Sequence, residues 1–170
     1  MAKWNLDTSH SEVHFKVKHM VISTVTGSFD KFDAHIESDS ENFENATFGF
    51  TADVNSINTK NSDRDTHLKS DDFFSADQFP QLKFESLSGI ENNKVEGELE
   101  IIGHKQKVVL NVDFGGVITD PWGNNRAGFE FTGEINRKDF GLTWSSTTEA
   151  GGLVVSDKVK LIVNLEFIQG

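Results

Sequence analysis

The chain contains no cysteine, which excludes disulfide bonds, thiol catalysis and Cys-ligated zinc or iron–sulfur centres. Its apolar runs are short, and none reaches the length of a membrane span. The N-terminus also lacks the apolar stretch of a signal peptide. We therefore expect a soluble, cytoplasmic protein with no stable membrane insertion; a periplasmic or secreted location would require a leader that has been trimmed.

Positive charge is scarce. The 16 Lys and Arg residues stand against 27 Asp and Glu, giving a formal net charge of −11, and no basic cluster occurs along the sequence. Such a chain repels a polyanion such as nucleic acid at long range. The same excess of acid disfavours docking on an anionic membrane surface. We expect neither partner.

Aromatic residues are distributed very unequally among the three types. There are 15 Phe, 3 Trp and no Tyr. Tyr and Trp suit half-hydrated positions because each carries a polar atom, whereas Phe carries none. The abundance of Phe therefore indicates dry surface, which is either a packed core or an apolar cavity.

Apolar and polar residues alternate along most of the chain, as in strands that bury one face. We expect eight such strands, near residues 12–19, 32–37, 47–55, 82–86, 95–101, 108–114, 129–135 and 159–167. Eight antiparallel strands form either a sandwich, whose edges need protection, or a closed barrel, which has no edges. We favour an all-β, eight-stranded antiparallel barrel that takes up residues 1–170 as a single domain.

One segment, residues 61–74, breaks this alternation. Asn61 or Ser62 can cap a helix, Asp63 and Asp65 suit its first turn, and Leu68 can face inward. The sequence therefore predicts a short helix between the third and fourth strands.

The inward-facing residues leave two interpretations open. They can simply pack against one another, or they can surround a cavity. Several of them are small and stand beside Phe, so they fill a barrel lumen poorly: Ala34, Ala52, Ser86, Gly97 and Gly133. Unfilled space inside a protein is costly, and this favours a cavity with an occupant.

Several stretches, taken in order, resemble the YceI-like family, the polyisoprenoid-binding proteins of lipocalin-like fold. They are residues 4–7 (WNLD), 9–19 (SHSEVHFKVKH), 25–29 (VTGSF), 61–74 (NSDRDTHLKSDDFF), 97–105 (GELEIIGHK), 120–123 (DPWG) and 133–144 (GEINRKDFGLTW). The resemblance implies an extended lipocalin-like barrel around a long apolar tail. Polyprenyl phosphates, isoprenoid quinones and fatty-acid-like amphiphiles are the ligands that it implies. It is also compatible with a homodimer.

The candidate ligand-binding residues form two groups. The inward Phe residues are the expected cavity wall, and three polar residues could contact a ligand head group. The full set is Phe15, His19, Phe32, Phe48, Phe50, Arg64, His67, Phe84, Phe114, Phe129 and Phe131. For Arg64 the alternative is a local ion pair with Asp65 that closes the helical connection.

Metal binding and catalysis have little support in the sequence. His10 and His14 would stand about 13 Å apart on a strand, too far to share an ion. The motifs of nucleophile elbows, zinc proteases, phosphate loops and dinucleotide sites are all missing. We expect no cofactor, no metal and no enzyme activity, and we favour a transport or storage protein for a lipid. The alternatives are an enzyme acting on an isoprenoid inside the barrel, and an interaction module without a ligand.

Overall fold

The computed structural model describes residues 2–19, 22–39, 43–71, 73–142 and 155–170. Most of these residues lie in strands of one continuous sheet. The strands are β1 (Ala2–Leu6), β2 (Glu12–His19), β3 (Ser23–Phe29), β4 (Phe32–Ser38), β5 (Thr47–Asp53), β6 (Ile57–Asn58), β7 (Gln81–Ser86), β8 (Lys94–Ile101), β9 (His104–Thr119), β10 (Asn125–Asn136) and β11 (Val155–Gln169). The helices are α1 (Ser62–Lys69) and three short 3-10 turns, η1 (Thr8–His10), η2 (Val54–Ser56) and η3 (Arg137–Phe140).

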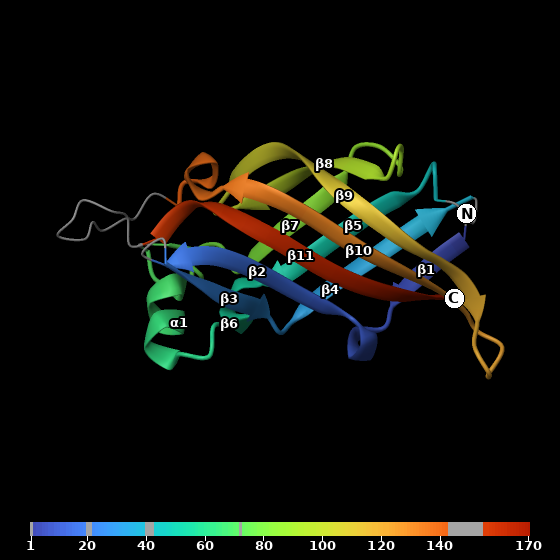
Figure 1. Ribbon diagram of the computed structural model, residues 1–170, viewed down its shortest axis with the longest axis horizontal. Helices are drawn as coiled ribbons and strands as arrows, with labels where there is room; N and C mark the ends of the chain where they lie inside the picture. Colours follow the sequence, from blue (N-terminus) through green and yellow to red (C-terminus); the bar gives the residue numbers. More distant parts are fainter. Residues whose placement is uncertain (1, 20–21, 40–42, 72, 143–154) are drawn as a thin grey trace.

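The sheet closes on itself. Neighbours follow the order β1-β4-β5-β7-β8-β9-β10-β11, and β11 pairs with β1 to complete the circle. β2 lies beside β11 further along the same edge, so β1 and β2 are halves of one bent barrel strand, separated by η1. β3 with β4, and β5 with β6, are halves in the same way. The eleven segments therefore form the eight-stranded closed antiparallel barrel that the alternation predicts, and this prediction is confirmed (Figure 1).

The predicted helix is also present. α1 lies between β6 and β7, and the Asn61 side chain caps it by accepting a hydrogen bond from the Arg64 amide at 3.0 Å. Leu68 packs on the core, and the Phe74 ring behind the helix meets the edge of Phe29 at a centroid distance of 6.2 Å. Figure 1 shows α1 at one end of the barrel and both termini at the other. Among the described residues, none of the helices has both the length and the apolar character needed to cross a bilayer.

The barrel interior near the termini is filled by rings, which we call the aromatic plug: Trp4, Phe43, Phe114, Phe129 and Phe167. Phe43 is fully buried, and its centroid lies 5.4 Å from Trp4 and 5.0 Å from Phe129. Phe129 stacks on Phe114 at 5.0 Å. Tilted and edge-to-face contacts at such distances are favourable beyond the area that they bury. This end of the barrel is therefore a packed core.

Candidate functional site

An apolar cavity occupies the barrel interior beside the aromatic plug. It holds about 740 Å³ of atom-free space, part of which is open to solvent, but the centre of a water-sized sphere can move over only about 90 Å³ of it. Most of this space is therefore too close to the wall for a water-sized sphere, and the cavity is narrow. Its wall consists of Val13, His14, Phe15, Phe29, Ala34, His35, Phe48, Gly49, Phe50, Phe84, Leu99, Val108, Leu110, Phe131, Leu161, Val163, Leu165 and Phe167.

Two glycines determine where the rings of two Phe residues in the cavity wall lie. Phe15 stands opposite Gly27, and a Cβ on that glycine would lie 2.2 Å from the Phe15 Cζ. In the same way, a Cβ on Gly97 would lie 2.3 Å from the Phe84 Cζ. Each ring therefore lies over a glycine, against the barrel wall, in space that any larger residue would occupy. Because these rings keep to the wall, the middle of the barrel stays open.

The sequence analysis expects Gly97 and Gly133 to fill the lumen poorly, and the structure shows which side chains take the space beside them. Phe84 covers Gly97, and the Leu110 Cδ2 would lie 2.6 Å from a Cβ on Gly133. The small residues widen the cavity by receiving a neighbour's side chain, since the neighbour then no longer projects into the lumen.

The structure separates the predicted Phe residues into two sets. Phe15, Phe48, Phe50, Phe84 and Phe131 line the cavity. These five are the predicted rings that a ligand in the cavity would touch.

The other predicted Phe residues lie outside the wall. Phe114 and Phe129 belong to the aromatic plug. Phe32 stacks on Phe50 at 6.3 Å and borders a shallow groove at the bend between β3 and β4. None of the three is part of the described cavity wall.

Sequence reasoning also left out several residues that line the cavity. Leu110, Leu161 and Val163 lie on strand faces that the alternation marks as inward. Phe29 belongs to β3, a strand that the alternation does not predict. The alternation could have found the aliphatic residues, because it favours any inward side chain and not only Phe.

The three polar candidates lie away from the described cavity wall. Arg64 donates from Nη2 to the Thr59 carbonyl at 2.6 Å and from Nε to the Thr59 hydroxyl at 2.8 Å, while Asp65 accepts from the Thr59 amide at 2.9 Å. Arg64 and Asp65 thus both fasten the start of α1 to Thr59. The His67 ring meets Phe73 edge-on at 5.1 Å. His19 ends β2, and its side chain lies outside the described part of the structure.

A network of charged residues ties the barrel together near the termini. Arg126 donates from Nε to Asp120 and from Nη1 to both Asp7 and Glu166, each at 2.8 Å. Asp7 precedes η1, Glu166 lies on β11 and Asp120 begins the β9–β10 turn, so one guanidinium joins three separate segments. Hydrogen bonds from Ser9, Arg126 and His10 hold the pKa of the Asp7 carboxyl far below its usual value. The bond from Arg126 lowers the pKa of Asp120 to about 2.

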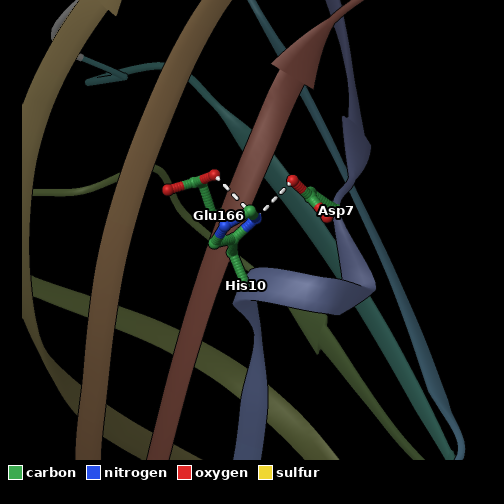
Figure 2. A group of neighbouring side chains, drawn as sticks. All are labelled: Asp7, His10 and Glu166. Atoms are coloured by element: carbon green, nitrogen blue, oxygen red, sulfur yellow. Dashed lines mark hydrogen bonds and ion pairs between the residues drawn. The ribbon is translucent and has the colours of Figure 1, made fainter.

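Figure 2 shows Asp7, His10 and Glu166 of this network, whose ligand atoms all lie within 4.8 Å of one another. That spacing would suit a metal ion. However, Asp7 Oδ2 and Glu166 Oε2, the two oxygens nearest His10, are the same atoms that accept from Arg126 Nη1. The guanidinium already supplies the positive charge that these carboxylates require, so the geometry fits an ion-pair clamp better than a metal site.

A second arginine, Arg137, also joins separate parts of the chain, and unlike Arg126 it is buried. It is only 2 % exposed, and it donates to the carbonyls of Leu142 at 2.7 Å and Ser156 at 3.0 Å. Burial lowers its pKa, while Asp157, 3.8 Å away, opposes that change. Arg137 therefore ties η3 to the start of β11, and its donors are directed at the chain itself.

The closed barrel and its apolar interior define a class: lipocalin-like barrels that enclose a small apolar volume. Comparison with known proteins gives the particular family. The family model described as the YceI-like domain matches residues 4–167, nearly the whole chain, so the protein belongs to the YceI-like family. UPF0312 protein SA2479 of Staphylococcus aureus (strain N315) is similar to it, with 39% identity over 168 residues that cover 98% of each chain.

Solved structures agree with this fold. The YCEI protein of Campylobacter jejuni is 33% identical over 90% of each chain, with a TM-score of 0.77. BcnA of Burkholderia cenocepacia superposes with a TM-score of 0.80 at 23% identity, covering 95% of this chain and 99% of its own. A domain of Saccharophagus degradans described as polyisoprenoid-binding gives 0.71 at 18% identity over 98% of each chain. The last two likenesses, at such low identity, support the fold alone.

Proposed function

We propose that this protein binds an elongated apolar ligand in the barrel cavity and acts as its carrier or store. The ligand class is a polyisoprenoid lipid, an isoprenoid quinone or a fatty-acid-like amphiphile. The observation that carries the proposal is the narrow apolar cavity inside a closed barrel. The Saccharophagus degradans domain, which shares the fold and is described as polyisoprenoid-binding, is a precedent for such a ligand.

Burial of hydrocarbon is the proposed source of affinity. Each methylene group transferred from water to the cavity contributes about 0.8 kcal/mol. An empty apolar cavity destabilises a protein by about 24 cal/mol per Å³, so the 90 Å³ region costs on the order of 2 kcal/mol when nothing fills it. A ligand tail removes that cost as well. No bond needs to be made or broken for this role, and we propose binding rather than catalysis.

The aromatic plug suggests how the ligand lies. Because rings fill the barrel at the terminus end, a tail would extend towards the plug and its polar head would lie at the α1 end. Arg64 and His67, on α1, remain the head-group candidates of the sequence analysis. Phe15 and Phe84 would contact the tail directly.

The test is direct recovery of the ligand. Protein purified without detergent is weighed by native mass spectrometry, then extracted with organic solvent, and the extract is identified. We expect a mass above that of the chain, which organic solvent releases as an apolar molecule. A matched pair of variants places a Trp on the inner or the outer face of the same strand. Leu110→Trp fills the cavity and should abolish ligand retention. Val109 points outward and is 54% exposed, so Val109→Trp should retain the ligand.

Two results would contradict the proposal. One is wild-type protein that carries only the mass of its own chain, even after incubation with a total lipid extract. The other is equal retention by Leu110→Trp and Val109→Trp, because the ligand would then lie outside the cavity. Recovery of a chemically altered lipid after long incubation would instead favour an enzyme.

A further inference from the structure

The fold gathers lysines that are dispersed in the sequence. Lys16 and Lys18 on β2 and Lys158 and Lys160 on β11 are all exposed and border one shallow groove on the outer wall of the barrel. We call these four residues the lysine face. It stands out in a chain whose net charge is −11. The two strands are more than a hundred residues apart in the chain, so the sequence shows no basic cluster although the structure has one.

Two of these lysines face each other across the sheet. Lys16 and Lys160 are directly opposite in the β2–β11 register, where like charges are unfavourable. On its other side Lys160 is opposite Glu134 of β10, but neither lysine forms an ion pair with any residue in the described ranges. An anion from outside the chain would stabilise this arrangement.

The two carboxylates at the groove, Glu134 and Asp157, offset only part of the charge of its four lysines. Glu134 lies 3.6 Å from Lys158, and Asp157 lies 3.4 Å from Lys138 at the groove's margin. Each of the two acids therefore already has a cation of its own. The charge of Lys16 and Lys160 remains available to a partner.

An exposed apolar residue adjoins the lysine face. Ile22 is 84% exposed and immediately precedes β3, where Thr24 pairs with Lys18 and accepts a hydrogen bond from its Nζ at 3.1 Å. Lysines around an exposed aliphatic side chain match a bilayer interface, where the amines meet anionic head groups and the apolar residue enters the acyl boundary. The end of β2 and the start of β3 lie at the α1 end of the barrel, opposite the aromatic plug (Figure 1).

We propose that the lysine face and Ile22 dock the protein on the surface of an anionic lipid bilayer, with the α1 end of the barrel near the membrane. The inference rests on charge, register and exposure, and it does not depend on what the cavity holds. The acid spread over the rest of the molecule opposes the approach, so docking is reversible and weakens as salt screens the lysines. This proposal departs from the expectation from net charge alone, because the fold brings four dispersed lysines to one face of the barrel.

Vesicle co-sedimentation at low salt tests the proposal. One set of vesicles contains phosphatidylcholine only, and the other contains equal amounts of phosphatidylcholine and phosphatidylglycerol. The wild-type protein should sediment with the anionic vesicles and remain in solution with the neutral ones. The double variant Lys16→Gln/Lys160→Gln should bind the anionic vesicles roughly tenfold to thirtyfold more weakly.

The matched control removes the same number of lysine charges from another face of the barrel. Lys83 on β7 and Lys94 on β8 are exposed and lie across the barrel from β2 and β11 in the strand order. The double variant Lys83→Gln/Lys94→Gln should bind the anionic vesicles as the wild type does. Ile22→Ser should weaken binding while leaving its salt dependence unchanged, since it removes only the apolar contact.

Several outcomes would overturn the inference. They are wild-type protein that stays in solution with both vesicle types, equal binding to neutral and anionic vesicles, and equal loss of binding in the two double variants. Displacement by inorganic phosphate beyond the effect of matched ionic strength would show a site for free anions instead of a bilayer surface. The ligand-recovery experiment is independent, because Lys16→Gln/Lys160→Gln leaves the cavity wall intact, so failure of docking and failure of the proposed function can be told apart.

Discussion

The two ends of the barrel interior use the same residue type in opposite ways. In the aromatic plug, Phe129 is 4% exposed and its ring contacts those of Phe43, Phe114 and Phe167. In the cavity, Phe15 and Phe84 lie over glycines against the wall. The difference comes from the neighbouring strand: where it carries a glycine opposite or diagonal to the Phe, the ring can leave the centre of the barrel. Phenylalanine content alone therefore does not distinguish a core from a binding site.

The largest expected effect contrasts one ring from each region. Phe129→Ala should lower the free energy of unfolding by about 3–5 kcal/mol, because it removes a ring that is enclosed on all sides. Phe15→Ala should cost less than half as much, since its ring already borders open space. Urea unfolding monitored by circular dichroism measures both. Equal losses would mean that the cavity is as tightly packed as the plug.

The ion-pair clamp at the plug end should dominate the acid response of stability. Asp120 has its pKa lowered from 3.8 to about 2, mainly by Arg126, and the Asp7 pKa is lowered further. A lowered folded-state pKa stabilises the protein above the unfolded value and loses that effect as pH falls through the folded value. Stability should therefore decline between about pH 4 and pH 2. Arg126→Ala should lower the melting temperature at pH 7 and flatten this decline.

Thermal melts at a series of pH values give both the melting temperature at pH 7 and its decline in acid. Lys94→Ala, which removes an exposed cation on β8, a strand that contributes no residue to this network, is the control and should leave the acid profile unchanged. An unaltered profile in Arg126→Ala would mean that the guanidinium does not set these carboxyl pKa values.

The smallest effect is expected at the tip of the β9–β10 hairpin, which lies outside both regions. Trp122 is 80% exposed there, whereas Trp4 in the plug is 3% exposed. Trp122→Ser should change the free energy of unfolding by less than about 0.5 kcal/mol. Denaturant titration followed by the fluorescence of the remaining tryptophans measures it. A larger loss would reveal a packing contact for Trp122 that its exposure does not suggest.

Local patterns predicted most of the fold. Eight alternating stretches and the capping signal at Asn61 indicate the barrel and the position of α1. β1 and β3 were missed: β1 has only five residues, and β3 (STVTGSF) is rich in Ser, Thr and Gly, so neither presents a clear apolar face. In the barrel these segments are the other halves of the bent strands that contain β2 and β4. A break such as η1 interrupts the alternation of apolar and polar residues. The sequence then indicates only one half of a long barrel strand.

The candidate site was only partly predictable, because its decisive contacts join residues distant in the chain. Alternation marked Phe15 and Phe84 as inward but could not show that each ring would lie over a glycine of the neighbouring strand. Arg126 and Asp7 are 119 positions apart, and no spacing rule links them. The facing pair Lys16 and Lys160 depends likewise on strand register. Register is set by the whole barrel, so these features come only from the folded structure.

The central claim is that rings held over glycines keep a channel open for a hydrocarbon chain, and one measurement tests it most directly. It is the affinity for a fluorescent long-chain fatty acid, titrated into delipidated wild-type protein, Gly27→Ala and Gly128→Ala. The three atoms nearest to a Cβ at Gly27 all belong to the Phe15 ring, which must move into the cavity, whereas a Cβ at Gly128 meets nothing within 4 Å. The account predicts tight binding by the wild type and Gly128→Ala and much weaker binding by Gly27→Ala. Equal affinity in all three proteins would contradict it.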